Sequence, residues 1–291
     1  MAQAVWEPLI PKDAITIFSG GTEGVLSPHV TLVVRSKNNA PTGLVAAVGH
    51  TRDLAPEEVG TADHATSVAE TVRSLVEGLN AKPADVHLAL VKCPLLTTAK
   101  IEVIRAAGKP PLTSDTYESM ALSRYASAIG IASALDELAD SDVAAALQSK
   151  QVWSAKASCS SGAELEDNHI FILATDSSLD ASEARVRAAS RPMRDAIDAE
   201  AVLSLLEQVK QANGKVLQVF AKAEADPSGL VRGSRHTMNT DSDIHSTRHA
   251  RAAVGGLLAG LTGDTQLYVS GGAEGQGAPG GGSLCIVYET S

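Results

Sequence analysis

A short motif occurs three times in this 291-residue chain, and internal repetition of this kind constrains the fold more than any single predicted element does. The three copies read Ser-(Gly/Ser)-Gly-(Thr/Ala)-Glu and span Ser19–Gly24, Ser160–Glu164 and Ser270–Gly275. Apolar runs typical of strands follow the copies at Val30–Val34, His169–Ala174 and Leu284–Tyr288. Glycine supplies the backbone angles that a sharp reversal after a strand requires. Each serine is therefore predicted at the end of a strand, beside unpaired backbone N–H groups.

The second and third copies share a longer pattern in which a lysine, an arginine and the motif serine follow one another. Buried-strand patterns at Val86–Val91 and Val216–Ala221 end in Lys92 and Lys222. Helical patterns follow at Tyr117–Leu135, which carries Arg124, and at Asp243–Leu261, which carries Arg248. Earlier helices are predicted at His64–Leu79 and Ala199–Gln211, with Asp198 as the N-cap of the second. The unit reads strand, helix, strand with Lys, helix with Arg, strand with Ser, strand.

This order predicts an α/β fold made of repeated units. We expect a partial first unit over residues 1–41, a second unit over 42–177 and a third over 178–291. The first unit has the motif serine and its flanking apolar runs, including Ile15–Phe18, but no matching Lys or Arg precedes Ser19. The first unit is therefore expected to be truncated.

The composition excludes several classes of function. A net charge of −10 argues against a nucleic-acid or anionic-membrane surface, and no apolar run approaches the roughly 20 residues of a membrane span. The three widely spaced cysteines fit a reducing cytoplasm better than a disulfide scaffold. We expect a cytoplasmic protein that forms a homo-oligomer, such as a homotetramer, and binds a small molecule.

A serine beside a lysine is a known pairing of a nucleophile with its base. Burial and neighbouring cations lower the pKa of a lysine, so that it can accept the proton of the hydroxyl. An arginine can hold a carbonyl oxygen, and the N–H groups of a Ser-Gly-Gly turn suit an oxyanion hole. The alternative is that these are ordinary strand-end turns, a surface lysine and an arginine on a helix face. The repetition of the ordered set favours a catalytic site.

Six strings carry a resemblance to a known family. They are SGGTEGVLSPH (Ser19–His29), VKCPLLT (Val91–Thr97), TYESM (Thr116–Met120), FAKAEA (Phe220–Ala225), RHTM-x-x-DSDI-x-STRHARA (Arg235–Ala252) and YVSGGAE-x-QG (Tyr268–Gly277). Together they resemble the cyanuric acid hydrolase/barbiturase family of ring-opening amidohydrolases, over nine-tenths of the chain. The resemblance implies three homologous domains in a barrel-like body with a pseudo-threefold axis. It also implies hydrolysis of a cyclic amide such as cyanuric acid to carboxybiuret, which loses CO2 to give biuret.

The resemblance also implies roles for individual residues. Ser160 matches the nucleophile and Lys92 its base, while Ser270 with Lys222 and Ser19 belong to the other domains. Arg124 and Arg248 match arginines that clamp the substrate, and the residues after each serine match substrate and oxyanion contacts, namely Gly20, Ser161 and Gly271. The residues alone leave open which serine attacks, because the pairs look equivalent.

No organic cofactor is expected, but the resemblance implies a metal site for Mg²⁺ or Ca²⁺. Its matching positions are Glu224, Ala273, Gln276, Gly277, Ala278 and Gly281. Carboxylate and backbone oxygens are the ligands that these ions prefer. The chain departs from the family here, since Ala278 stands between Gln276-Gly277 and Pro279, where the family commonly has Pro directly after Gln-Gly.

Several alternatives accompany this interpretation. The same chemistry suits a barbiturase, and the incomplete first unit suits an inactive homologue that only binds a ligand or partner. Cys159 adjoins Ser160 and is a candidate nucleophile, but strand alternation would point it away from the site. His245 and His249 have helical i,i+4 spacing, yet no third ligand accompanies them at the spacing of a zinc protease.

Overall fold

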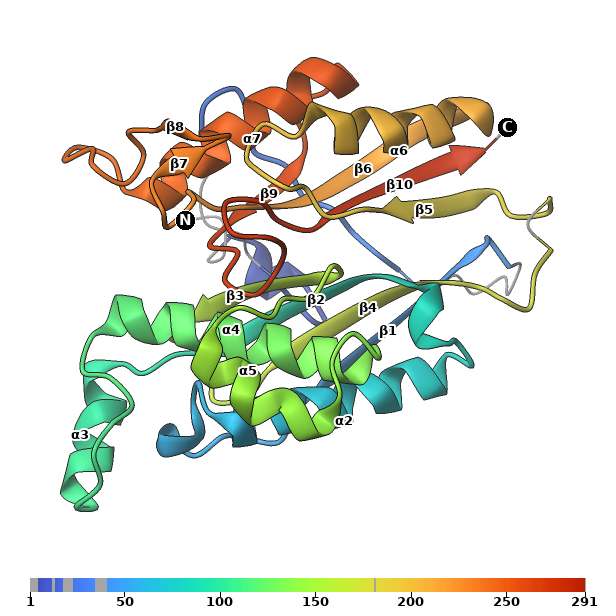
Figure 1. Ribbon diagram of the computed structural model, residues 1–291. Helices are drawn as coiled ribbons and strands as arrows, with labels where there is room; N and C mark the ends of the chain where they lie inside the picture. The colour runs from blue at the N-terminus through green and yellow to red at the C-terminus, as the bar shows by residue number, and fades with distance from the viewer. Residues whose placement is uncertain (1–4, 12–13, 18–22, 35–40, 181, 291) are drawn as a thin grey trace.

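Two four-stranded sheets of the same topology are stacked face to face in the computed structural model (Figure 1). The structure describes residues 5–11, 14–17, 23–34, 41–180 and 182–290. The expected mixed α/β fold is confirmed within these residues. The pseudo-threefold barrel, the truncation of the first unit and the three domain boundaries stay predictions.

The first sheet has the strand order β1-β4-β2-β3. Its strands are β1 (Leu44–His50), β4 (His169–Thr175), β2 (Val86–Pro94) and β3 (Ala157–Gly162). β4 pairs antiparallel with β1 and with β2, whereas β2 and β3 are parallel. The parallel pair brings the ends of β2 and β3 to the same edge, where the sequence placed Lys92 and Ser160.

The second sheet repeats this arrangement in the order β5-β10-β6-β9. Its strands are β5 (Val186–Ser190), β10 (Leu284–Thr290), β6 (Gly214–Ala223) and β9 (Tyr268–Gly271). β10 is antiparallel to both neighbours, and β6 and β9 are parallel. The repetition predicted from the Lys-Arg-Ser order is therefore present as two sheets with equivalent pairing.

Helices cover the outer face of each sheet (Figure 1). The first sheet is accompanied by α2 (Ala62–Gly78), α3 (Thr98–Ala106), α4 (Thr116–Ala134) and α5 (Val143–Ser149), and the second by α6 (Ala199–Gln211) and α7 (Ser246–Thr262). The short elements are the 3-10 turns η1 (Glu7–Leu9), η2 (Pro56–Glu58), η3 (Pro83–Asp85) and η4 (Asp140–Asp142) and the hairpin of β7 (Leu230–Val231) and β8 (Ser234–Arg235). Asp198 caps α6 as expected, since its side chain accepts a hydrogen bond from the N–H of Ala201.

Because side chains alternate along each strand, the core has one layer between the two sheets and one layer between each sheet and its helices. On β2, Leu88 and Leu90 face the second sheet and pack with Phe171 of β4 and Phe220 of β6. Their neighbours on β2, such as Val91, face the helices on the other side. Because Lys92 is two residues beyond Leu90, its side chain lies on the inner face between the sheets.

The segment before β1 corrects one expectation. The predicted strands at Ile15–Phe18 and Val30–Val34 are absent over their described residues. A strand needs a ladder of backbone hydrogen bonds, and this segment makes only isolated contacts, such as the 2.9 Å bond from Ser27 N to the carbonyl oxygen of Thr265. The segment nevertheless packs on the second sheet, where Leu26 joins the core.

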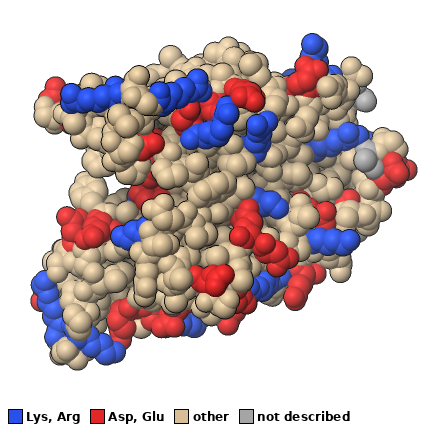
Figure 2. Space-filling view, viewed as in Figure 1, with Lys and Arg blue, Asp and Glu red and all other residues tan. Residues whose placement is uncertain are grey.

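Acidic and basic side chains lie side by side over the face shown in Figure 2, and they are interspersed there in keeping with the mixed charges of the sequence. Among the helices that the structure describes, none is long and apolar enough to cross a membrane.

Candidate active site

Two lysine–serine pairs lie opposite each other in register on the parallel strand pairs. Lys92 of β2 is the register partner of Ser160 on β3, and Lys222 of β6 is the register partner of Ser270 on β9. Each pair lies toward the carboxyl ends of its two strands, which are on the same side of the sheet because the strands are parallel. The repeated order of lysine and serine in the sequence thus corresponds to two equivalent Lys–Ser pairs in the structure.

Lys222 lies at the junction of the two sheets and is fully buried. Its Nζ is 3.0 Å from Ser270 Oγ, 2.8 Å from the carbonyl oxygen of Cys159 and 3.2 Å from that of Gly271. Burial first, and then the nearby Arg124 charge, lower the pKa of Lys222 to about 7. A lysine with this pKa is partly neutral near neutral pH, as a general base must be.

Lys92 and Ser160 have different partners. Lys92 Nζ is 2.6 Å from Glu164 Oε1, and the Glu164 side chain is 43% exposed. Ser160 Oγ is buried and has no hydrogen-bond partner among the described residues. The serine hydroxyl is therefore free of competing contacts, whereas the lysine beside it is held by a carboxylate.

The glutamate that ends each motif copy holds an arginine in two of the three copies. Arg124 donates from Nε and Nη2 to the two carboxylate oxygens of Glu274, both at 2.7 Å. Arg251 makes the same two-pronged contact with Glu23 at 2.7 and 2.6 Å. Burial disfavours the Glu274 anion, but the Arg124 charge and hydrogen bonds outweigh burial and lower the pKa of Glu274.

Two arginines of α7 lie near Glu23, and they differ in exposure and in contacts. Sequence matching paired Arg248 with Arg124, but Arg248 is 60% exposed in its side chain and only its Nε approaches Glu23, at 3.5 Å. Arg251, one helical turn further on α7, takes the place that corresponds to Arg124. Arg124 Nη1 is 3.3 Å from Ser161 Oγ, the side chain after the motif serine of the second copy. Arg251 lies near the equivalent position of the third copy, since a Cβ added to Gly271 would be 3.0 Å from Arg251 Nη1.

The glycines of the third motif copy allow this close approach. Gly272 has a positive φ of 77°, and a Cβ there would lie 2.8 Å from the Arg124 guanidinium. A side chain at position 272 would therefore clash with Arg124. Ser19 and Gly20, the equivalent positions of the first copy, lie outside the described residues.

The expected metal ligands gather where the loop after β9 meets the end of β6. Gly280 N donates to Glu224 Oε2 at 3.3 Å, and burial followed by the Glu274 charge raises the pKa of Glu224 to about 7. In the loop, Gln276 N donates to Ala273 O and Gly281 N donates to Ala278 O, both at 2.8 Å. A carbonyl oxygen has a second lone pair, so these atoms can still bind a cation. The poorly solvated carboxylate among backbone carbonyls fits a hard divalent ion.

Gln276 has a further contact that links the two sheets. Its side chain is fully buried, and its Oε1 accepts a 2.5 Å hydrogen bond from Cys159 N, directly before Ser160. Its Nε2 donates to the carbonyl oxygens of Gly272 and Glu274. The loop that carries the expected metal ligands is thus fastened to the strand that carries Ser160.

Two alternatives from the sequence lose support. Cys159 packs in the layer between the first sheet and its helices, and burial raises the pKa of its thiol well above the usual value. His249 Nε2 contacts Asp241 at 3.0 Å, but no third ligand joins His245 and His249 among the described residues. Sequence reasoning missed Glu23, Glu164, Glu274 and Arg251 as site residues, although the recurring glutamate of the motif was a visible signal.

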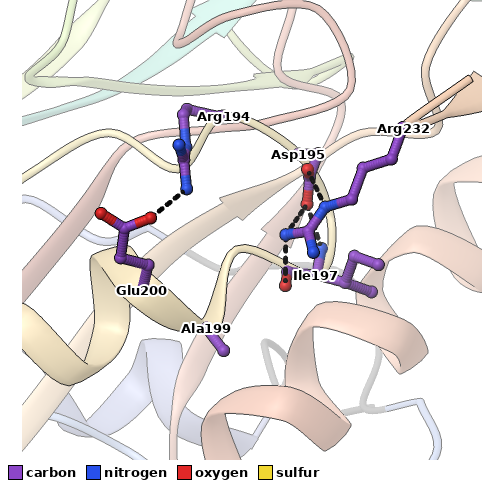
Figure 3. Close-up of a pocket in the computed structure, with 6 residues that line it drawn as sticks. All are labelled: Arg194, Asp195, Ile197, Ala199, Glu200 and Arg232. Carbon is purple, nitrogen blue, oxygen red and sulfur yellow. Dashed lines mark hydrogen bonds and ion pairs between the residues drawn. The ribbon is translucent and has the colours of Figure 1, made fainter.

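A surface pocket at the start of α6 is a separate feature (Figure 3). Its charged side chains neutralise one another: Arg194 pairs with Glu200 at 2.7 Å, and Arg232 pairs with Asp195 at 2.8 Å. No residue expected in the active site lines it. The buried Lys–Ser pairs are therefore the better candidate site.

The lowered pKa of Lys222 predicts how stability depends on pH. Between pH 7 and pH 10 the unfolded chain carries a proton that folded Lys222 lacks, so the free energy of unfolding rises with pH, by roughly 1 kcal/mol per pH unit at most. Lys222→Met removes this contribution, whereas Lys210→Met at an exposed position keeps it. Calorimetric unfolding across this pH range measures the slope. Equal slopes in wild type and Lys222→Met would contradict the prediction.

Comparison with known proteins places this chain in a family. The family model of amidohydrolase ring-opening proteins matches residues 4–289. The chain belongs to this family, whose members are amidohydrolases, enzymes that hydrolyse C–N bonds. The expected resemblance is confirmed.

Similar proteins cover the chain from end to end. A cyanuric acid amidohydrolase of Sarocladium sp is 64% identical over 291 residues, which is 100% of this chain and 84% of that protein. A cyanuric acid amidohydrolase of Pseudonocardia dioxanivorans is 54% identical, and the match covers 100% of this chain and 85% of that protein. A solved cyanuric acid hydrolase matches 99% of this chain and 84% of its own with a TM-score of 0.83 at 40% identity. The enzyme from A. caulinodans has a TM-score of 0.81 at 41% identity and covers 88% of this chain and 73% of its own.

Proposed function

We propose that this protein opens the ring of cyanuric acid by hydrolysing one of its amide bonds. The observation that carries the proposal is the pair of in-register Lys–Ser positions beside the buried Arg124. The substrate is inferred from the relatives, which are named cyanuric acid amidohydrolases at 64% and 54% identity. Cyanuric acid has three equivalent carbonyl groups, which suits a site built from repeated Lys, Arg and Ser positions.

In the proposed reaction, Ser160 Oγ attacks a ring carbonyl carbon. The hydroxyl proton passes to a lysine, which the family resemblance identifies as Lys92. The tetrahedral intermediate collapses with cleavage of the C–N bond, and the leaving nitrogen takes that proton. Water then hydrolyses the acyl-enzyme, so that the product is carboxybiuret, which loses CO2 to give biuret.

The two lysines have different partners, and these partners bear on which lysine can accept the proton of a serine hydroxyl. Lys92 Nζ is 2.6 Å from Glu164 Oε1, so this carboxylate competes with Ser160 for the amine that would accept the proton. Lys222 has no such carboxylate partner among the described contacts, and its pKa is about 7. The family resemblance supports our proposal of Ser160 as the nucleophile, whereas these contacts support Ser270 with Lys222 as the competing pair.

Arginines and backbone groups complete the proposed site. Arg124 and Arg251 would each bind a substrate carbonyl, and Glu274 and Glu23 hold their guanidinium planes. Arg251 replaces Arg248 in this role. The N–H groups at Ser161 and Gly271 would stabilise the oxyanion, and Ser19 and Gly20 would provide the third set of contacts.

A bound Mg²⁺ or Ca²⁺ would be held by Glu224 and by carbonyl oxygens of the loop at Ala273, Gln276, Gly277, Ala278 and Gly281. Such an ion would neutralise the half-buried Glu224 carboxylate and stiffen the loop. We expect saturating Mg²⁺ or Ca²⁺ to raise the melting temperature of the wild type but not that of Glu224→Gln. Asp264→Asn, an acidic surface position before β9, serves as the control that keeps the shift. A thermal shift of equal size in Glu224→Gln would contradict the metal assignment.

The function is tested with purified full-length chain and cyanuric acid as substrate. We expect release of CO2 and formation of biuret, both measured over time against a chain-free blank. Barbiturate is offered in parallel, and faster opening of its ring would reassign the substrate. Binding of cyanuric acid without turnover would show a ligand-binding homologue instead.

A further inference from the structure

A row of polar side chains crosses the inner face of the first sheet, and only half of it belongs to the proposed active site. His50 of β1 is the register partner of His169 on β4, His169 is the partner of Lys92, and Lys92 is the partner of Ser160. His169 alternates with Phe171 and Leu173, which pack between the sheets, so it faces inward. The two histidines extend this row to the opposite edge of the sheet.

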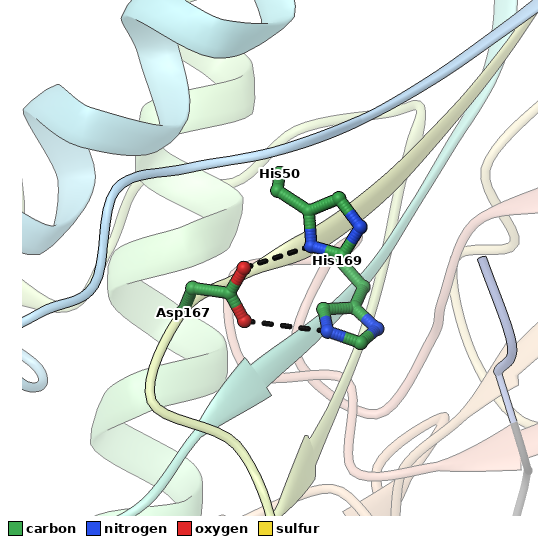
Figure 4. A group of neighbouring side chains, drawn as sticks. All are labelled: His50, Asp167 and His169. Atoms are coloured by element: carbon green, nitrogen blue, oxygen red, sulfur yellow. Dashed lines mark hydrogen bonds and ion pairs between the residues drawn. The ribbon is translucent and has the colours of Figure 1, made fainter. Parts of the chain in front are cut away.

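A carboxylate joins the two imidazole rings there (Figure 4). Asp167 Oδ2 is 2.8 Å from His50 Nδ1, and Asp167 Oδ1 is 3.3 Å from His169 Nε2. The ring centroids are 4.4 Å apart. One ligand atom from each residue lies within 4.8 Å of the other two. Three groups that bind metals well therefore converge from two strands and the loop between β3 and β4.

The backbone around these residues is fastened in place. Asn168, between Asp167 and His169, is fully buried, and its N–H donates to Thr51 Oγ1 at 2.9 Å. Thr51, directly after His50, donates its own N–H to the carbonyl oxygen of Asn168 at 3.0 Å. Lys100 Nζ donates to the carbonyl oxygen of Leu165 at 2.6 Å, which fixes the loop from its other end. The backbone positions of all three residues are thus fixed before any ligand arrives.

We propose that His50, Asp167 and His169 form a binding site for a divalent transition-metal ion of the Zn²⁺ type. Two imidazole nitrogens and one carboxylate oxygen are a recurrent protein ligand set for Zn²⁺, with a fourth position open to water. His50 is 48% exposed in its side chain, so solvent reaches the site. Bonds of about 2.0 Å place tetrahedral ligands roughly 3.3 Å apart, and the exposed His50 ring can close the remaining separation.

The local charge is suited to a cation. Asp167 supplies a negative charge between the two imidazole rings. His169 Nδ1 is buried without a hydrogen-bond partner among the described residues, so the protein does not saturate this ring by itself. The nearest lysine, Lys92, is already paired with Glu164.

This site differs in chemistry from the one proposed at Glu224. The Glu224 site offers only oxygen atoms, which select Mg²⁺ or Ca²⁺, whereas nitrogen ligands select Zn²⁺ and its neighbours. The two sites also lie on different sheets, since Glu224 follows β6. A bound ion would tie the end of β1 to the start of β4. The ion would thereby fix the His50–His169 end of the row of side chains that also contains Lys92 and Ser160.

The test is equilibrium titration of the full chain with Zn²⁺ in buffer that contains excess Mg²⁺, which saturates the oxygen site. We expect one Zn²⁺ per chain and a rise in melting temperature on binding. His50→Ala and Asp167→Asn should each weaken Zn²⁺ binding by about tenfold or more. His249→Ala is the matched control, because His249 also contacts an aspartate at 3.0 Å but belongs to no group of three convergent ligands among the described residues.

A second measurement covers the case in which a variant folds poorly. Titration of the wild type with Co²⁺ should give the intense visible absorption of a four-coordinate nitrogen-containing site, and His50→Ala should lose it. Unchanged Zn²⁺ affinity in both His50→Ala and Asp167→Asn would overturn the proposal. So would a wild type without saturable Zn²⁺ binding in excess Mg²⁺. Neither readout depends on ring-opening activity, so failure of the metal site is distinguishable from failure of the proposed function.

Discussion

Ser160→Ala is expected to reduce turnover of cyanuric acid by roughly a thousandfold or more, because the variant lacks the attacking oxygen. The fold should be unaffected, since Ser160 Oγ has no hydrogen-bond partner among the described residues. Steady-state release of biuret measures the loss. Far-UV circular dichroism and the melting temperature confirm that the variant is folded.

Ser158 provides the matched control on the same strand. It lies two residues earlier on β3, and its Oγ is likewise buried without a partner. Ser158→Ala should keep turnover within a few-fold of the wild type. If Ser270→Ala abolishes turnover while Ser160→Ala leaves it intact, the nucleophile is Ser270 and Lys222 is its base.

Glu274→Gln is expected to lower the free energy of unfolding by about 3 kcal/mol, because it leaves the buried Arg124 charge without its partner. The side chains of this pair are only 10% and 27% exposed. The same variant should raise KM for cyanuric acid, since Arg124 is no longer held beside Ser161. Denaturant unfolding measures the stability change, and kinetics measure KM.

The control for Glu274→Gln is a pair of the same chemistry in solvent. Arg194 and Glu200 are 61% and 68% exposed, so Glu200→Gln should cost less than about 1 kcal/mol. Replacing Arg124 by Met together with Glu274→Gln should recover part of the lost stability, because no uncompensated charge then stays buried. A Glu274→Gln variant as stable as the wild type would show that Arg124 finds another partner.

Much of the fold was predictable because local patterns and tertiary packing agree. The apolar spacing of Ala199–Gln211 predicts α6 with its observed bounds, and Asp198 forms the expected cap. The strand patterns before Lys92 and Lys222 also coincide with β2 and β6. Short elements such as α3 and α5, of 9 and 7 residues, were not predicted, because so few turns leave too little periodicity to detect.

The site was predictable in its residue types but less so in its contacts. Arg248 and Arg251 are three residues apart on α7, so helical periodicity places both on a similar face and cannot choose between them. Which of the two arginines pairs with Glu23 depends on where tertiary packing places Glu23, and the sequence of α7 does not contain that information. Likewise, His50, Asp167 and His169 converge only through the pairing of β1 with β4, and that pairing spans more than a hundred residues of sequence.

The two arginine–glutamate clamps have a consequence for the order in which the protein matures during synthesis. Arg124 meets Glu274 across 150 residues, and Arg251 meets Glu23 across 228 residues. Gln276, which is fastened to the strand of Ser160, follows its partner Cys159 by 117 residues. The first sheet can therefore fold before residues 274–276 are synthesised, but Arg124 gains its partner only after they are. Chains that stop before Glu274 lack both the partner of Arg124 and the contact from Gln276 to Cys159.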